Sequence, residues 1–120
     1  MEFTQQNANT NTIISTDEYS VSLSHVKLNR PCFISSASSK EVYISDLDDI
    51  SKEFLFPLIT PDSVDLLIIG TGESPKFLTP KQQIELSNMG LGVECMNNSS
   101  ACSSFNLLLG DLRKVGLLLI

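Results

Sequence analysis

One stretch decides the fold: VDLLIIGTG, from Val64 to Gly72. Leu66 to Ile69 are apolar without interruption, which is typical of a strand covered on both faces. Gly70 and Gly72 follow directly, and glycine allows backbone angles and close approaches that a side chain would block. The stretch therefore predicts a central strand that ends in a tight loop at the edge of a sheet.

The chain of 120 residues has the length of one domain, and its 42% hydrophobic and 18% charged residues are ordinary for a globular protein. Residues 1–12 are rich in Gln, Asn and Thr and offer little to bury, so we expect a disordered tail there. Residues 13–120 are expected to form a single small α/β domain.

The net charge of −6 would repel phosphate backbones, which makes nucleic acid a poor partner. The cysteines, an odd number at irregular spacing (Cys32, Cys95 and Cys102), favour a reducing compartment. A single histidine cannot build a His-based zinc site, and no cofactor motif is present, so we expect no metal and no cofactor. The N-terminus lacks the apolar core of a signal peptide, and no apolar run reaches the ~18 residues of a membrane span. These features predict a soluble, cytoplasmic protein.

Short strands are expected before the central one. Apolar residues alternate with polar ones through residues 19–28, Asn29-Arg30-Pro31 suits a turn, and residues 32–34 are expected to return as a partner strand. Another short strand is predicted at residues 42–44. Within residues 46–59, apolar residues at three- and four-residue steps suit a short helix that Ser51 could cap and Pro57 would end early.

The second half predicts β-α-β-α-β. Thr79, Pro80 and Gln82 fit the N-cap, first-turn and capping-box positions of a helix, and Gly90 fits its left-handed C-terminal position. Ile84, Leu86 and Met89 are expected to supply the apolar contacts of this helix. A strand over residues 91–96, a helix from Ala101 to about Asp111 and a buried strand over residues 114–120 complete the pattern. The fold class is therefore α/β in three layers, with helices packed on a central mixed sheet after an antiparallel β start.

Two neighbouring features are candidates for ligand binding. The loop Gly70-Thr71-Gly72 could present backbone N–H groups to an anion, and so could the helix start at Ser99 and Ser100. A tight structural turn and plain helix capping are the favoured readings, because Pro75 occupies the place of a third glycine and Asn and Ser are ordinary capping residues. If a cleft exists between them, Asn106 and Arg113 are expected to line it as hydrogen-bond donors.

Other polar residues favour structural roles. Cys102 lies near a helix start, where a thiol can become reactive, but nothing ties it to His25 as a base, and a buried inert thiol is favoured. Cys95 is expected in the core. Asp111 and Arg113 suit a local ion pair, with partner binding by Arg113 as the alternative. The carboxylates at 46, 48 and 49 lack the glycine and closing glutamate of a calcium loop, so a solvated face is favoured.

The C-terminal half resembles a known family through four segments: DLLIIGTG at 65–72, FLTP at 77–80, GLGVECM at 90–96 and ACSSFNLLLGDLRKVGLLLI at 101–120. The resemblance is to the MTH-nine-three-eight-like domain family, a domain of unknown function whose mitochondrial branch is the third assembly factor of respiratory complex I. It implies a three-layer α/β fold and no assigned enzymatic activity. Phe105 stands where the family commonly has Tyr, Asp111 where it has Glu, and Asn97 to Ser100 where it has Thr. A shared catalytic role at these places is therefore less credible.

We therefore expect a non-catalytic protein-interaction module, an accessory or assembly factor for a membrane complex of the complex I type. The absence of a nucleophile–base or metal constellation in the sequence supports this expectation. The alternative is a domain that binds a small anionic ligand, or an undetected enzyme, in the cleft beside Gly70 to Gly72 and the Ser99 helix start. The sequence leaves the partner and the choice between monomer and weak dimer open.

Overall fold

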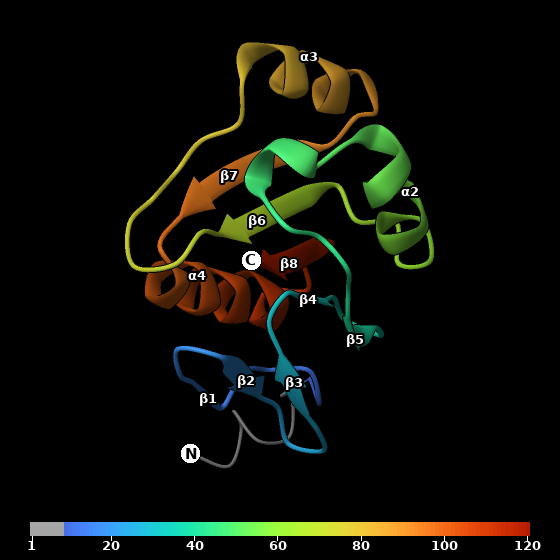
Figure 1. Cartoon of the computed structure of the whole chain (residues 1–120). Coiled ribbons are helices and arrows are strands. Elements are labelled where there is room, and N and C mark those ends of the chain that lie inside the picture. Colours follow the sequence, from blue (N-terminus) through green and yellow to red (C-terminus); the bar gives the residue numbers. More distant parts are fainter. Residues whose placement is uncertain (1–8) are drawn as a thin grey trace.

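The computed structural model describes residues 9–120 and shows two sheets with one long helix between them (Figure 1). The smaller sheet is antiparallel, with strand order β1-β2-β3; its strands are β1 (Ser15–Thr16), β2 (Ser20–Ser22) and β3 (Lys27–Asn29). The larger sheet is mixed, with order β5-β4-β8-β6-β7; its strands are β4 (Cys32–Ile34), β5 (Ser39–Glu41), β6 (Leu66–Gly70), β7 (Gly92–Met96) and β8 (Val115–Leu119). The α/β fold with an antiparallel start and a central mixed sheet is thus confirmed.

The central strands β6 and β8 lie side by side and run parallel, with Leu66 opposite Val115 and Gly70 opposite Leu119. The side chains of both strands are almost entirely buried. Each fully buried Leu or Ile contributes roughly 1.5–3 kcal/mol relative to an exposed one. This explains why the two continuous apolar runs, rather than any alternating segment, occupy the middle of the sheet.

Two apolar clusters lie on opposite faces of the larger sheet and define the layers. On one face, Ile68, Leu117 and Leu119 pack with α4 (Asn98–Gly110) and with the inner residues of the smaller sheet. On the other face, Leu67 and Leu118 pack with α2 (Lys52–Ile59), α3 (Pro80–Asn88) and the 3-10 helix η1 (Leu47–Asp49). Helix α4 is therefore covered by a sheet on each side, whereas α2 and α3 form an outer layer (Figure 1).

The helix ends follow the local sequence closely. Thr79 and Gln82 form a complete capping box around Pro80, and Gly90 has a φ of 78° just beyond the C-cap Met89. Ser51 caps α2 by accepting a hydrogen bond from the Phe54 N–H. Among residues 9–120, no helix combines the length and the apolarity needed to cross a membrane.

Four local expectations are wrong. Strand β4 does not pair with the preceding hairpin but lies between β5 and β8, because Cys32, Phe33 and Ile34 are fully buried and need apolar cover on both faces. Residues 42–44 form no strand, since the hairpin partner of β4 is the earlier segment β5.

The other two errors concern helices. Pro57 lies inside α2 and does not end it; its missing N–H removes a single bond near the C-terminal end, and the helix continues to Ile59. Ile84 is 63% exposed and contributes no core contact, whereas Leu86 on the same helix is buried.

The N-terminal tail is only partly described, because residues 1–8 lie outside the described part of the chain. Asn11, which belongs to the predicted tail, is 4% exposed and donates hydrogen bonds from Nδ2 to the carbonyl oxygens of Ser35 (2.8 Å) and Ser38 (3.1 Å). At least Asn11 is therefore packed against the domain.

Substitution of Gly116 on β8 would test how closely the core is packed. A Cβ at this position would lie 2.9 Å from Phe33 Cε1 and 3.2 Å from Val64 Cγ1, so Gly116→Ala should lower the free energy of unfolding by about 1–3 kcal/mol. The matched control is Gly110→Ala in α4, where a Cβ meets nothing within 4 Å; it should raise this free energy by roughly 0.5–1 kcal/mol. Urea unfolding at 25 °C measures both, and a Gly116→Ala variant as stable as the parent would contradict the packing described.

Candidate functional site

The Gly70-Thr71-Gly72 loop is tied to the start of α4. A Cβ on Gly70 would lie 2.6 Å from Asn98 Oδ1 and 2.6 Å from Leu119 Cδ2, so only glycine permits this approach. Gly72 has a φ of 93°; its N–H donates to Asn98 Oδ1 (2.9 Å), and its carbonyl oxygen accepts from the Asn98 N–H (2.8 Å). The loop N–H that would have faced an anion is thus already used.

The other polar groups of this region are also largely satisfied. The Thr71 hydroxyl donates to the Ser74 carbonyl oxygen (2.9 Å) and accepts from the Lys76 N–H (2.9 Å), which folds the loop back on itself. Asn97 is the N-cap of α4, and its Oδ1 accepts from the Ser100 N–H at 2.8 Å. Helix capping and a tight turn therefore account for the hydrogen bonds of most residues in this region that were predicted to bind a ligand.

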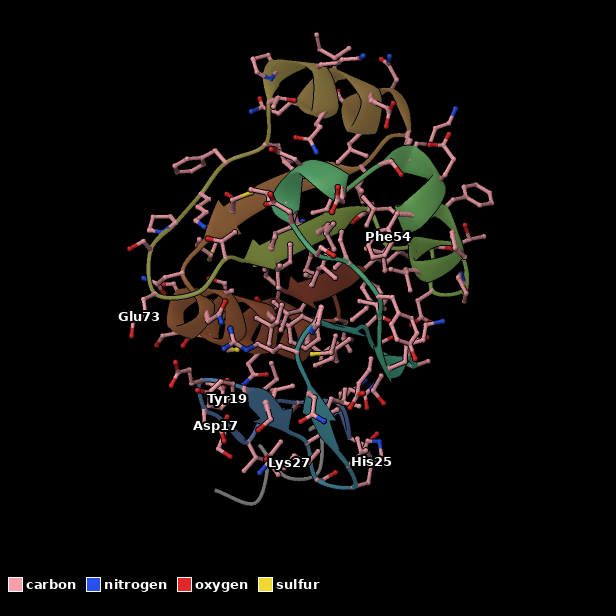
Figure 2. The ribbon with its side chains drawn as sticks, in the orientation of Figure 1. Asp17, Tyr19, His25, Lys27, Phe54 and Glu73 are labelled. Atoms are coloured by element: carbon pink, nitrogen blue, oxygen red, sulfur yellow. The ribbon has the colours of Figure 1, made fainter. Side chains whose placement is uncertain are left out.

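A cleft of about 440 Å³ nevertheless opens beside these elements. Gly72, on the loop after β6, and Ser99, in the first turn of α4, line one side of it. Thr16, Asp17 and Glu18, at the turn between β1 and β2, line the other side. The remaining lining residues are Arg30, Glu73, Asn97 and Asn98. Figure 2 shows Glu73 on the loop after β6, on the same side of the molecule as Asp17 and Tyr19. The cleft is thus formed where the first hairpin, the glycine loop and the start of α4 meet.

Arg30 is the cation of this cleft, whereas the sequence predicted only a turn at this residue. It follows β3 directly, far in sequence from the glycine loop. Its Nη1 donates one long hydrogen bond (3.4 Å) to the Ile120 carbonyl oxygen, and its buried Nε has no partner within residues 9–120. A guanidinium carries five N–H donors, so Arg30 has unused hydrogen-bonding capacity.

The carboxylates of the cleft differ in their surroundings. Asp17 Oδ1 accepts from the N–H groups of Tyr19 and Ser20, both at 2.8 Å, and the Ser20 hydroxyl also donates to it (3.0 Å). These hydrogen bonds, with the Tyr19 N–H as the largest cause, lower the pKa of Asp17 below its ordinary value, so it is ionised at neutral pH. Glu18 and Glu73 are exposed to solvent. The cleft is therefore acidic at its rim, with one guanidinium beside it.

Of the seven predicted ligand residues, Gly72 and Ser99 line this cleft, whereas five do not: Gly70, Thr71, Ser100, Asn106 and Arg113. Asn106 instead clamps the N-terminal segment: its Oδ1 accepts from the Ile13 N–H (2.8 Å), and its Nδ2 donates to the Ile13 carbonyl oxygen (2.9 Å). Arg113 lies past the C-terminal end of α4, beside a separate hollow of about 260 Å³. The expectation that both residues line the same cleft as Ser99 is wrong, because Asn106 lies about two turns beyond the helix start and Arg113 lies beyond the opposite end of α4.

Cys32 and Cys102 are buried, Cys95 is half-buried against the core, and all three thiols are protonated at neutral pH. Burial is the main cause that raises the pKa of Cys32 to about 12 and of Cys102 to about 11; it also raises the pKa of Cys95. His25 lies in the turn between β2 and β3, away from α4 (Figure 2). Within the described ranges, no three His, Cys, Asp or Glu side chains are grouped so that they could hold a metal ion.

Comparison with known proteins places the chain in a family. Residues 13–120 match the model of a protein of unknown function (DUF498/DUF598). The chain belongs to this family. It is 32% identical over 96 residues to the 13 kDa major membrane protein of Francisella tularensis, an alignment that covers 77% of this chain and 76% of the relative. It is 29% identical over 92 residues to the bovine NADH dehydrogenase (ubiquinone) 1 alpha subcomplex assembly factor 3, which covers 75% of this chain but 50% of that protein.

Solved structures share the fold. A protein from Bordetella parapertussis superposes with a TM-score of 0.81 at 23% identity, covering 94% of this chain and 97% of that one. A Mth938-like domain from Bordetella pertussis gives a TM-score of 0.76 at 20% identity, covering 93% of this chain and 86% of that one. The resemblance to the Mth938-like family is thus confirmed. The chain spans about half the length of the bovine assembly factor that it matches.

The reactivity of the Cys102 thiol tests whether this side chain is buried and protonated. In the folded protein at pH 7.5, iodoacetamide should modify Cys102 about 100-fold more slowly than in the urea-unfolded chain, because a pKa near 11 instead of 9 lowers the thiolate fraction by that factor. From about pH 9 to pH 11 the unfolded chain loses a proton that the folded chain keeps, so the free energy of unfolding should fall with rising pH.

The control is Cys102→Ala. In this variant the free energy of unfolding should fall less steeply between about pH 9 and pH 11 than in the parent chain, since the other titrating groups are the same in both. Peptide mass spectrometry follows the labelling. Rapid modification of Cys102 in the folded protein at pH 7.5 would contradict a buried, protonated thiol.

Proposed function

We propose that this protein is a non-catalytic protein-interaction module that assists the assembly of a membrane-bound respiratory complex of the NADH dehydrogenase type. The observation that carries the proposal is the similarity to an assembly factor of NADH dehydrogenase over three quarters of this chain. The family model extends over residues 13–120, which include both central strands, α4 and the residues that line the cleft.

The chemistry of the cleft supports recognition more than covalent catalysis. Its lining supplies hydroxyls, amides, carboxylates and one guanidinium, and the nearby Cys102 is protonated at neutral pH. Large apolar side chains such as Tyr19 and Tyr43 are exposed, and tyrosine is enriched in protein interfaces. These groups suit contact with another protein.

We also propose that the protein works in the cytoplasm at a membrane surface. The three free thiols suit a reducing compartment. Two names support association with membranes. One relative is named a major membrane protein, and one of the similar solved structures is named an outer membrane protein from Bartonella henselae. Binding to subunits of a membrane-bound complex would hold the domain at the bilayer.

The proposal is tested by capture of the tagged full chain, after mild crosslinking, from source cells that assemble an NADH dehydrogenase. We expect subunits of that enzyme to be enriched at least tenfold over a tagged, unrelated acidic protein of similar size, and found with the tagged chain in the cytoplasmic and peripheral-membrane fractions. Quantitative mass spectrometry measures the enrichment. Absence of these subunits, together with unchanged membrane NADH:quinone activity in cells that lack the protein, would overturn the proposal.

Binding of a small anionic ligand, with or without an enzymatic step, is the second candidate. The cleft of about 440 Å³ and the unsatisfied guanidinium of Arg30 favour it. The carboxylates of Asp17, Glu18 and Glu73 oppose it, because they repel a second negative charge at the same rim.

A thermal-shift screen separates the two candidates. A ligand at 100 times its Kd would add about 2.7 kcal/mol of stability, which corresponds to a shift of several degrees in Tm. Because of the acidic rim, we expect inorganic phosphate, dicarboxylates and nucleotides each to leave Tm unchanged within about one degree. A rise of several degrees that is lost in Arg30→Gln and kept in the matched variant Arg113→Gln would instead establish the ligand site.

A further inference from the structure

Three neighbouring hollows on one side of the molecule share lining residues, and we call this row of hollows the acidic groove. The cleft at the start of α4 (about 440 Å³) and the next hollow (about 370 Å³) share Glu18 and Arg30 in their linings. That second hollow shares Pro31, Ile44 and Ser45 with a third (about 430 Å³), which reaches Phe54 on α2. Figure 2 shows Glu73 near one end of this path and Phe54 near the other. A row of neighbouring hollows of this kind suits an extended chain better than one compact molecule.

The backbone along the groove is unpaired. Val42 donates its N–H to the Pro31 carbonyl oxygen at 3.0 Å, and then Tyr43, Ile44 and Ser45 make no backbone hydrogen bond within residues 9–120. Two of these residues have high β propensity. An extended partner segment can pair with such a backbone as an added strand, in which main-chain hydrogen bonds supply affinity.

The side chains of the groove combine an apolar floor with exposed aromatic rims. Pro31, Ile44 and Ile120 are half-buried, whereas Tyr19 is 72% and Tyr43 is 98% exposed. Tyrosine rings can cover the stem of a lysine or arginine and attract its charge through the ring face. Their exposure leaves this area open for a partner.

The charge of the groove selects the partner. Its lining carries four carboxylates, Asp17, Glu18, Asp49 and Glu73, against the single guanidinium of Arg30. Asp46 and Asp48 are exposed beside Asp49 and carry further negative charge. A second copy of this chain would bring a net charge of −6 to this surface and be repelled.

We propose that the acidic groove binds an extended segment of a partner protein that carries lysine and arginine residues. Three observations support this proposal: the row of neighbouring hollows, the unpaired backbone at Tyr43 to Ser45, and the excess of carboxylates. This inference rests on the proposed interaction function and names the partner's chemistry. The backbone of the segment pairs with Tyr43 to Ser45, the spare donors of Arg30 take its carbonyl oxygens, and the carboxylates at both ends take its cationic side chains. Electrostatic complementarity of this kind gives specificity and fast association.

The probe is a random 12-residue peptide library displayed on phage and selected on the folded full chain, followed by fluorescence anisotropy of the selected peptides. We expect selected peptides to be enriched in lysine and arginine and to bind at least tenfold more weakly to the triple variant Glu18→Lys, Asp49→Lys and Glu73→Lys. The matched control is Asp65→Lys, Glu94→Lys and Asp111→Lys, which changes net charge equally at exposed positions outside the groove; it should change Kd by less than threefold. None of the three groove side chains makes a hydrogen bond within residues 9–120, so the fold should tolerate their exchange, which circular dichroism checks.

Two further measurements distinguish a groove from a general charge effect. Tyr43→Ala should weaken binding severalfold, whereas Ile84→Ala, an exposed apolar residue on α3, should not. Amide exchange at Tyr43 to Ser45 should slow at least tenfold when a selected peptide binds. Selection of neutral or acidic peptides, selection of none, or equal binding to both triple variants would overturn the inference.

The same variants separate this inference from the proposed function. If the groove triple variant still captures NADH dehydrogenase subunits as the parent does, the groove proposal fails and the proposed function stands. If the parent captures none of them while basic peptides still bind the groove, the proposed function fails and the groove proposal stands.

Discussion

The structure depends on the burial of both faces of the paired strands β6 and β8. Their side chains are nearly all inaccessible, so each face needs a complete apolar cover. Helix α4 supplies one cover, together with the smaller sheet, and α2 with α3 supplies the other. The absence of a side chain at Gly70 lets Asn98 and Ala101 at the start of α4 approach β6 closely, and this contact fixes the helix over the end of the strand.

That close approach also forms one wall of the cleft. Because α4 starts directly beside the glycine loop, Gly72 and Asn98 bond to each other, and the first hairpin on the far side of α4 contributes Asp17 and Glu18 to the same cleft. Arg30 lies where the chain leaves the hairpin for β4. The groove is thus a consequence of one chain crossing between two sheets, and its charges come from segments that have no local relation in the sequence.

Membership of a family of unknown function leaves chemistry to be inferred from the site. The site has buried, protonated thiols, a satisfied glycine loop and a capped helix start, and these are features of a rigid scaffold. What the scaffold leaves unsatisfied is one guanidinium, a short extended backbone and a rim of carboxylates. The contacts proposed with a partner protein would use these groups.

The sequence by itself determined the features that depend on neighbouring residues. The apolar runs of β6 and β8, the capping box at Thr79 and Gln82, and the glycine at the end of α3 are all correct, because each is specified within a few residues. Only the tertiary structure decided which strands become neighbours, that residues 43–45 make no backbone hydrogen bond within residues 9–120, and that Arg30 rather than Arg113 reaches the cleft beside Ser99. The physical reason is that these outcomes depend on contacts between segments distant along the chain, which local propensity and periodicity do not encode.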